Sequence, residues 1–270
     1  MDDTYRRTIK NYYQSEAMTL DFAQPSTVSY LNDWCNEKTN GMVPTIIENL
    51  SPEAVLVLMN AIYFKAGWTE KFESNKTQDV LFTCTNGKNV KCPMMHQPNA
   101  IALYGNNDIF ESLCLSFGQG DIWSMYFLLP NKGKTVDDVV NSLTDDVWNY
   151  SMNLEQAIVD IKIPRFRVEN TIELNGIITQ MGGQTMFTGD ADYSLMSKNH
   201  KDIYVSKLMQ KAAVVVSEEG AEASAVTVAI EDGSAVSNKK ASFYADRPFV
   251  YVIREESTGM IFFIGTFQGE

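Results

Sequence analysis

The chain has 270 residues, of which 44% are hydrophobic, and a formal net charge of -12. This length and composition allow a full hydrophobic core and suit one large domain or two smaller ones. The acidic balance argues against a nucleic acid or heparin as a partner, because phosphate and sulphate groups bind to basic faces. No apolar run reaches the ~18 residues that a membrane span requires, so none is expected.

The first elements are expected to be helical. Residues 3–16 place Tyr5, Ile9, Tyr12 and Tyr13 at helical spacing, which predicts an amphipathic helix. Residues 17–22, AMTLDF, then predict a short strand. A second helix is expected to begin with a cap at Ser26 or Thr27 and to end at Asn40 and Gly41. Its apolar face would carry Val28, Leu31, Trp34 and Cys35.

The middle of the chain is expected to be rich in strands. Residues 54–68, AVLVLMNAIYFKAGW, predict a strand buried on both faces at the centre of a sheet. Residues 80–129 predict several strands with turns at 86–87 and 118–120. A helix is expected from Thr135, a strand over residues 157–168 that Pro164 interrupts, and a helix within residues 171–182 that Gly182 and Gly183 terminate.

The last part of the chain again predicts strands. A long one is expected over residues 203–220, followed by three over residues 241–245, 248–255 and 260–267, of which the last two would form a hairpin around residues 257–259. Strands and helices are interspersed without regular βαβ units. We therefore expect a single α+β domain over residues 1–270.

Motifs of catalysis and of cofactor binding are absent from the sequence. The zinc motif HExxH, the phosphate-binding loop GxxxxGK[ST] and the nucleophile elbow GxSxG do not occur, and there are only two histidines, His96 and His200. We expect no catalytic residue, no metal, no cofactor and no enzyme. Cys84 and Cys92 flank a hairpin-like segment, and either a disulfide or two ordinary thiols would fit that spacing.

One segment, EEGAEASAVTVAI at residues 218–230, has unusually small side chains. As a strand it would place Ala221, Ala223, Ala225, Thr227 and Ala229 on one face. Such a strand could enter between two existing strands without overpacking the core beneath. An ordinary edge strand or linker with small side chains would fit the same pattern.

Five segments, taken together, resemble the serpin family. In chain order they are LNDWCNEKTNG, NAIYFKAGWTEKF, IPRFRVENTIELNGIITQMG, SEEGAEASAVT and FYADRPFVYVIREESTGMIFFIGTF, and the family has them in the same order. The resemblance extends over essentially the whole chain. It implies the serpin fold, with a large sheet A, sheets B and C and surrounding helices. The family's N-terminal helices A to D have no counterpart in the sequence.

The resemblance implies a suicide inhibitor of serine or cysteine proteases. A target protease would attack an exposed reactive-centre loop, residues 218–240, and form a covalent acyl-enzyme complex. The cut loop would then insert into sheet A and distort the protease. The hinge implied for this insertion comprises Glu218, Glu219, Gly220, Ala221, Glu222, Ala223, Ser224, Ala225, Val226 and Thr227.

The predicted position of the reactive bond depends on the residue from which it is counted. Counting forward from Gly220 places it between Ser234 and Ala235, whereas counting back from Pro248 indicates Ser237, so Val236 and Ser237 are alternatives. These small residues suit a protease of elastase-like or subtilisin-like specificity. A non-inhibitory serpin-like fragment, whose loop is only a substrate, is the alternative function.

Other residues correspond to conserved control points of the family. Trp68 matches the tryptophan of the breach and Asn60 the asparagine of the shutter, while Gln210 stands where histidine is usual. An amide can replace one hydrogen bond of an imidazole. We expect a monomer. If the sequence is part of a longer chain, we expect that chain to act outside the cell or in the cell envelope. No signal peptide is visible in the sequence.

Overall fold

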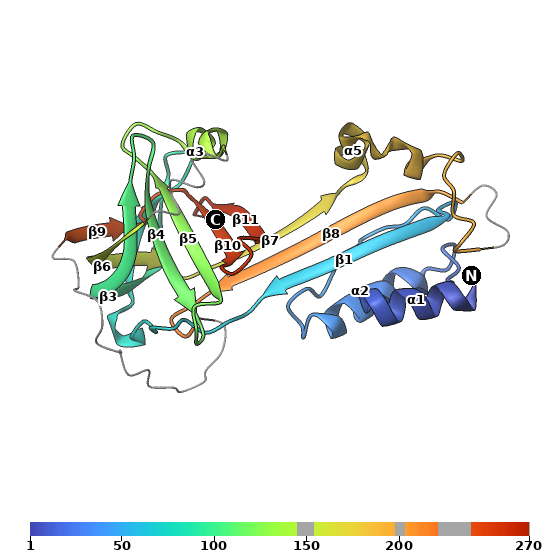
Figure 1. The fold of residues 1–270 in the computed structure, drawn as a ribbon, viewed down its shortest axis with the longest axis horizontal. Helices are drawn as coiled ribbons and strands as arrows, with labels where there is room; N and C mark the ends of the chain where they lie inside the picture. Colours follow the sequence, from blue (N-terminus) through green and yellow to red (C-terminus); the bar gives the residue numbers. More distant parts are fainter. Residues whose placement is uncertain (145–153, 198–202, 221–238, 270) are drawn as a thin grey trace. The chain divides into compact units, whose positions relative to one another are not determined.

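A computed structural model describes residues 1–144, 154–197, 203–220 and 239–269, drawn in Figure 1. The chain forms two compact units. Unit 1 comprises Met1–Tyr63 and Glu169–Val214, and unit 2 comprises Phe64–Val168 and Val215–Glu270. Both contain helices and strands in a mixed arrangement, as the α+β prediction requires.

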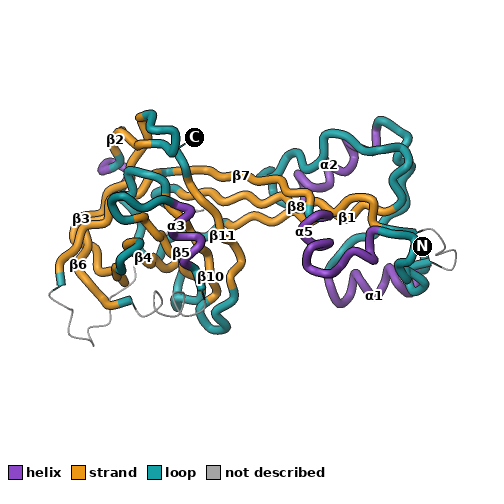
Figure 2. Tube along the Cα trace, turned by 90° about the horizontal axis from the view of Figure 1, so that it is seen from above, coloured by secondary structure: helices purple, strands orange, loops and turns teal. Residues whose placement is uncertain are grey.

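Unit 1 begins with two helices, α1 (Asp3–Tyr13) and α2 (Ser26–Lys38). Helix α1 ends before Glu16 because Gln14 takes a left-handed backbone conformation with φ 51°. The predicted side-chain cap of α2 is wrong, since Pro25 precedes the helix and Thr27 instead donates its hydroxyl to the carbonyl of Asp21. Figure 1 shows α1 and α2 on the same side of the neighbouring strands, and Figure 2 shows the two helices well apart from each other.

Three strands form a sheet that lies mostly in unit 1. They are β1 (Leu56–Phe64), β8 (Val205–Val216) and β7 (Phe166–Glu173), in the order β1-β8-β7. The prediction that residues 54–68 form a central, buried strand is wrong, because β1 lies at the edge of the sheet and none of its residues is buried. The predicted strand at residues 17–22 is also absent, since this stretch pairs with no strand in the described structure.

The core of unit 1 lies between α2 and the sheet. Leu31 and Cys35 of α2 pack with Met209 and Ala213 of β8. Beyond β7 the chain forms a short helix, α5 (Asn175–Ile178), followed by irregular turns in which Gly182 has φ 95°. The sequence placed the start of this helix too early, because residues 171–173 continue β7.

Unit 2 contains an eight-stranded sheet with the order β11-β10-β5-β4-β3-β6-β9, in which β2 also pairs with β3. All its pairs are antiparallel except β6 with β9. The strands are β2 (Gln78–Thr83), β3 (Asn89–Asn106), β4 (Phe110–Phe117), β5 (Trp123–Pro130), β6 (Glu155–Pro164), β9 (Lys240–Tyr244), β10 (Phe249–Glu255) and β11 (Ile261–Phe267).

The strand predictions for unit 2 are confirmed. Pro164 ends β6 and β7 resumes at Phe166, while β10 and β11 form the predicted hairpin with Gly259 at φ 72°. Helix α3 (Val136–Ser142) begins with a capping box between Thr135 and Asp138, and its continuation lies outside the described residues.

All four cysteines are free and buried thiols. In the ladder of β2 and β3, Cys92 lies opposite Val80, whereas Cys84 follows the last pair at Thr83 and Asn89. Four ladder positions separate the two cysteines, which is too far for a disulfide. Of the two alternatives from the sequence, the structure has the ordinary thiols.

Candidate functional site

Strand β8 leads directly into the small-residue segment through residues 217–220, which belong to unit 2. We call these four residues and the side chains that hold them the loop anchor. The anchor includes three of the predicted hinge residues, Glu218, Glu219 and Gly220. The remaining hinge residues from Ala221 to Thr227 and the candidate reactive bond at Ser234, Ala235, Val236 and Ser237 lie outside the described residues.

The carboxylate of Glu218 is the buried centre of the anchor. The residue is 5% exposed and its two oxygens accept hydrogen bonds from the guanidinium of Arg165, with Nε to Oε2 at 3.0 Å. Thr77 Oγ1 donates to Oε1 at 2.6 Å. Burial disfavours the charged form of Glu218, but the hydrogen bonds from Arg165 and Thr77 outweigh it and hold the pKa of this carboxyl below its usual range.

Trp68 and its neighbours hold the backbone of the anchor. The indole Nε1 of Trp68 donates to the carbonyl of Ser217 at 2.8 Å, and its backbone N–H donates to that of Glu219 at 3.3 Å. Phe72 N donates to the carbonyl of Glu218 at 3.0 Å. Trp68 is itself 3% exposed and stacks on Phe117 with ring centroids 4.3 Å apart. Consecutive carbonyls of residues 217–219 are therefore all bound.

Gly220 lies in a tight turn and is the last residue described before position 239. Its φ is +78°, and it forms an antiparallel bridge with Gly67. A Cβ at this position would lie 2.2 Å from the backbone nitrogen of Trp68 and 2.5 Å from the carbonyl oxygen of Ala66. Only glycine fits so close to another backbone and with this φ.

The predicted shutter residues meet in unit 1. Gln210 on β8 donates through Nε2 to Oδ1 of Asn60 on β1 at 3.2 Å. This is a side-chain link between the two neighbouring strands. The amide of Gln210 thus makes a hydrogen bond of the kind expected of a histidine replacement.

Sequence reasoning missed Arg165, Thr77 and Phe72. They lie 53 to 146 residues away from Glu218 along the chain, so no local pattern connects them. Arg165 carried one signal, because it is the single residue between Pro164, which ends β6, and Phe166, which begins β7. No sequence pattern around Thr77 or Phe72 indicates a role in the loop anchor.

The described residues show no group of three or more histidine, cysteine, aspartate or glutamate side chains that could hold a metal ion. No helix in the described part of the chain is long and apolar enough to cross a membrane. The anchor itself combines a buried ion pair, a packed indole and a tight turn. These groups can fix the start of a loop, and none of them is arranged as a nucleophile with a base.

A family model described as serpin (serine protease inhibitor) matches residues 1–268. The chain belongs to the serpin family. Serpin B3 of Homo sapiens is 32% identical over 98% of this chain and 69% of the relative. An uncharacterized serpin-like protein of Thermococcus kodakarensis is also 32% identical, over 97% of this chain and 62% of the relative.

Solved structures share the fold of this chain. The thermophilic serpin tengpin in its native state matches with a TM-score of 0.84 at 28% identity, over 99% of this chain and 69% of that structure. Human thyroxine-binding globulin in complex with thyroxine matches with a TM-score of 0.86 at 26% identity, over 98% of this chain and 70% of that structure. The recognition of a serpin and of its mixed sheet fold from sequence is confirmed.

Proposed function

We propose that this serpin chain is a suicide inhibitor of serine endopeptidases. The observation that carries the proposal is the difference between the residues on the two sides of Gly220. Residues 217–220 before and at the turn are fixed by Trp68, Arg165 and Gly67, and the residues that follow have small side chains on alternate positions. A loop that must insert as a strand needs a fixed starting point and no bulky side chains on its inner face.

The strand directions support insertion between β1 and β8. These two strands are neighbours and run in the same direction (Figure 1). A chain that turns at Gly220 and returns along β8 is antiparallel to β8, and hence to β1 as well. The bridge between Gly67 and Gly220 already has this antiparallel sense. Insertion would thus extend a pairing that begins at the anchor.

The inhibitory reaction requires only that the loop acts as a substrate of the protease. The hydroxyl of the protease's serine attacks a loop carbonyl, an ester bond forms, and the peptide bond breaks as the new amino terminus leaves with a proton. Insertion before water cleaves the ester would leave protease and serpin covalently joined. The small residues from Ser234 to Ser237 favour a protease with a shallow specificity pocket, of the elastase or subtilisin type.

The test is to mix the chain with pancreatic elastase and, separately, with subtilisin, and to run denaturing gels. We expect a complex of summed mass that resists denaturant. Ala223→Arg, on the inner face of the inserted strand, should abolish this complex, because the large charged side chain would be buried over the core. Ser224→Arg is the matched control on the opposite face and should still form the complex.

The second candidate function is a loop that is only a substrate. It is favoured by the sequence of residues 221–229, because small side chains also suit an ordinary linker that a protease can cut without insertion. Complete cleavage within residues 230–240 with no complex, for wild type and both variants alike, would support the second candidate and overturn inhibition by this chain.

A further inference from the structure

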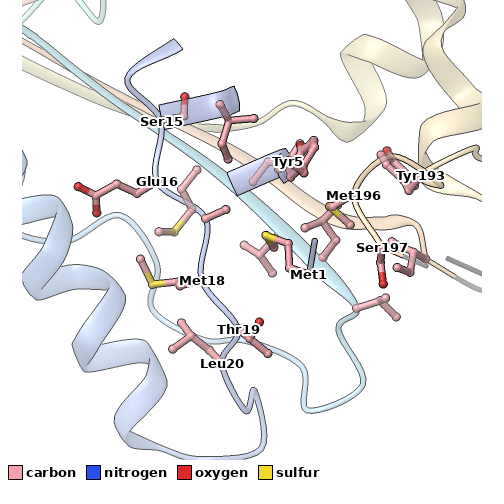
Figure 3. A pocket seen from close by; sticks show the side chains of 18 of the residues that line it. Met1, Tyr5, Ser15, Glu16, Met18, Thr19, Leu20, Tyr193, Met196 and Ser197 are labelled. Carbon is pink, nitrogen blue, oxygen red and sulfur yellow. The ribbon is translucent and has the colours of Figure 1, made fainter. Parts of the chain in front are cut away.

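Two groups of side chains lie apart from the loop anchor. One surrounds a cavity in unit 1 and is mainly apolar (Figure 3). Among the described residues that line this cavity, Glu16 alone has a charged side chain, and its carboxylate is already bound by Trp34 at 2.7 Å and by Lys38 at 2.6 Å. The other group lies in unit 2 and contains a histidine, the side chain that changes its charge between pH 5 and 8.

Three neighbouring strands bring this second group together. His96 of β3 places Nε2 2.7 Å from Oδ1 of Asp160 on β6. Tyr244 of β9 donates its hydroxyl to the other carboxylate oxygen, Oδ2, at 2.5 Å. In the strand register Lys162 stands between His96 and Tyr244, and its Nζ lies 4.7 Å from the centre of the Tyr244 ring. We call these four residues the β9 cluster.

The carboxylate of Asp160 is the centre of the β9 cluster. Burial disfavours its charged form, but the hydrogen bonds from Tyr244 and His96 outweigh burial and hold the pKa of Asp160 below its usual value. The hydrogen bond to Asp160 raises the pKa of Tyr244. On the other side of β3, β2 pairs only as far as Met94 and places no residue opposite His96. Within the cluster, a change of charge between pH 5 and 8 is therefore confined to His96.

Strand β9 has few ties to the sheet. It has five residues, and in the described structure it pairs with β6 alone, in the parallel sense that is slightly less stable per residue than the antiparallel one. Phe243 is the one buried side chain within the strand, whereas Tyr244 is 38% exposed. The hydrogen bond from Tyr244 to Asp160 is thus an important tie on the outer face of β9.

The same strand fixes the C-terminal end of the loop. Lys239 directly precedes β9, and its carbonyl accepts a hydrogen bond from the N–H of Ile158 at 2.9 Å. Pairing with all twelve residues of β8 would use twelve of the eighteen residues 221–238 and leave six to reach Lys239. Insertion of the uncut loop would therefore pull on β9, whereas insertion of the cut loop would not. Retention of β9 opposes insertion before cleavage.

We propose that the β9 cluster is a pH-dependent latch, which retains β9 and keeps the uncut loop outside the sheet more firmly in mild acid than in mild alkali. With a proton, His96 forms an ion pair with Asp160, and charge-assisted hydrogen bonds are roughly twice as strong as neutral ones. The ion pair fixes the carboxylate, so that Oδ2 stays in place for Tyr244. A charged His96 also repels Lys162 toward the Tyr244 ring. The effect on the loop rests on the proposed function, whereas the retention of β9 does not.

The test measures hydrogen exchange at the amides of residues 240–245 at about pH 5.5 and about pH 8, expressed as protection factors that allow for the intrinsic effect of pH. We expect protection in the wild type to fall by about fivefold from the lower to the higher pH, the loss of roughly one hydrogen bond. His96→Gln keeps an amide donor for Asp160 but cannot gain a charge, so its protection should be equal at both pH values. Tyr244→Phe should be less protected than the wild type at both.

Two controls accompany the exchange measurement. His200, the other histidine of the chain, is present in the wild type and in His96→Gln, so its titration does not distinguish them. The amides of β11 should keep the same protection in all three proteins. Wild-type protection at β9 that does not change with pH, or a pH dependence that persists in His96→Gln, would overturn the latch.

A second measurement follows the loop itself. The uncut chain is incubated at each pH, and the fraction that subtilisin can still cut within residues 230–240 is then determined at one common pH. This fraction should decline about fivefold more slowly in mild acid for the wild type and equally at both pH values for His96→Gln. Equal rates in the wild type would overturn the control of the loop by the latch. A wild type that is cut but forms no protease complex would overturn the proposed inhibition, and the two measurements would still decide the latch.

Discussion

At the scale of single residues, Glu218 and Glu219 are adjacent carboxylates in different surroundings. Glu218 has a side chain that is 6% exposed and binds Arg165 and Thr77. Glu219 has a side chain that is 51% exposed and pairs with Lys71 at 2.9 Å. Exposed ion pairs contribute little to stability because water and salt screen them, whereas a buried carboxylate depends on its partners. Substitutions at these two adjacent residues therefore compare a buried carboxylate with an exposed one.

Glu218→Gln should lower the free energy of unfolding by about 2 kcal/mol at pH 7, because it removes charged hydrogen bonds from Arg165. Glu219→Gln should lower it by less than about 0.5 kcal/mol. Urea titrations of the three proteins measure both effects. Equal losses in the two variants would contradict the role given to burial.

The difference in the free energy of unfolding between wild type and Glu218→Gln should depend on pH in one direction only. The pKa of Glu218 in the folded chain lies below the ordinary 4.5, so its contribution is present above pH 4.5 and is lost as the pH falls through the folded value. The gap in stability between wild type and Glu218→Gln should consequently narrow in acid. A gap of unchanged size at low pH would show that the glutamine is destabilising for a reason other than charge.

At the scale of elements, α2 is tied to the chain that follows it by one side chain. Asn32 donates through Nδ2 to the carbonyl of Ile47 at 2.8 Å, and its Oδ1 accepts from the N–H groups of Ile46 and Ile47 at 2.9 and 3.1 Å. Ile46 and Ile47 are buried in the same core cluster as Leu31 and Cys35. A single amide thus holds the connection between α2 and β1 against the core.

Asn32→Ala should lower the free energy of unfolding by about 2 kcal/mol, because two buried N–H groups and one carbonyl lose their partner. Asn36→Ala, one helical turn later and exposed, should change it by less than about 0.5 kcal/mol. Thermal or urea unfolding followed by circular dichroism measures both. Similar losses of stability in the two variants would mean that helix propensity, and not the hydrogen bonds of Asn32, accounts for the effect.

At the scale of the whole molecule, the proposed inhibition implies that the intact chain is not in its most stable state. Cleavage within the loop would let a further strand join β1 and β8. A strand that contributes several kcal/mol would raise the thermal midpoint by roughly 10 °C or more in a chain of this length. Strand insertion thus predicts a cut protein that is more stable than the uncut one.

The measurement is a thermal scan of the chain before and after limited cleavage by elastase, with both fragments retained. We expect the higher midpoint in the cut wild type and no increase in cut Ala223→Arg. A cut wild type with an unchanged or lower midpoint would mean that the loop stays outside the sheet.

Local patterns predicted most of the elements of unit 2, where alternating apolar residues, Pro164 and the glycine turns all act within a few residues. They failed at β1 and at residues 17–22, because whether an apolar strand is central depends on which strands lie beside it. The family resemblance located Glu218, Gly220 and Trp68. It could not supply Arg165 and Thr77, which reach the anchor only through the tertiary structure.

The loop anchor also has a consequence for the order of folding. Its contacts join residues that are 53, 141 and 149 positions apart, from Arg165, Thr77 and Trp68 to residues 217 and 218. Contacts over such separations carry a high entropic cost of loop closure and tend to form late. During synthesis, Trp68, Thr77 and Arg165 leave the ribosome long before Glu218 does. The nascent chain therefore holds an unmatched guanidinium and indole until residues 217 and 218 have been made, and the anchor can form only after that point.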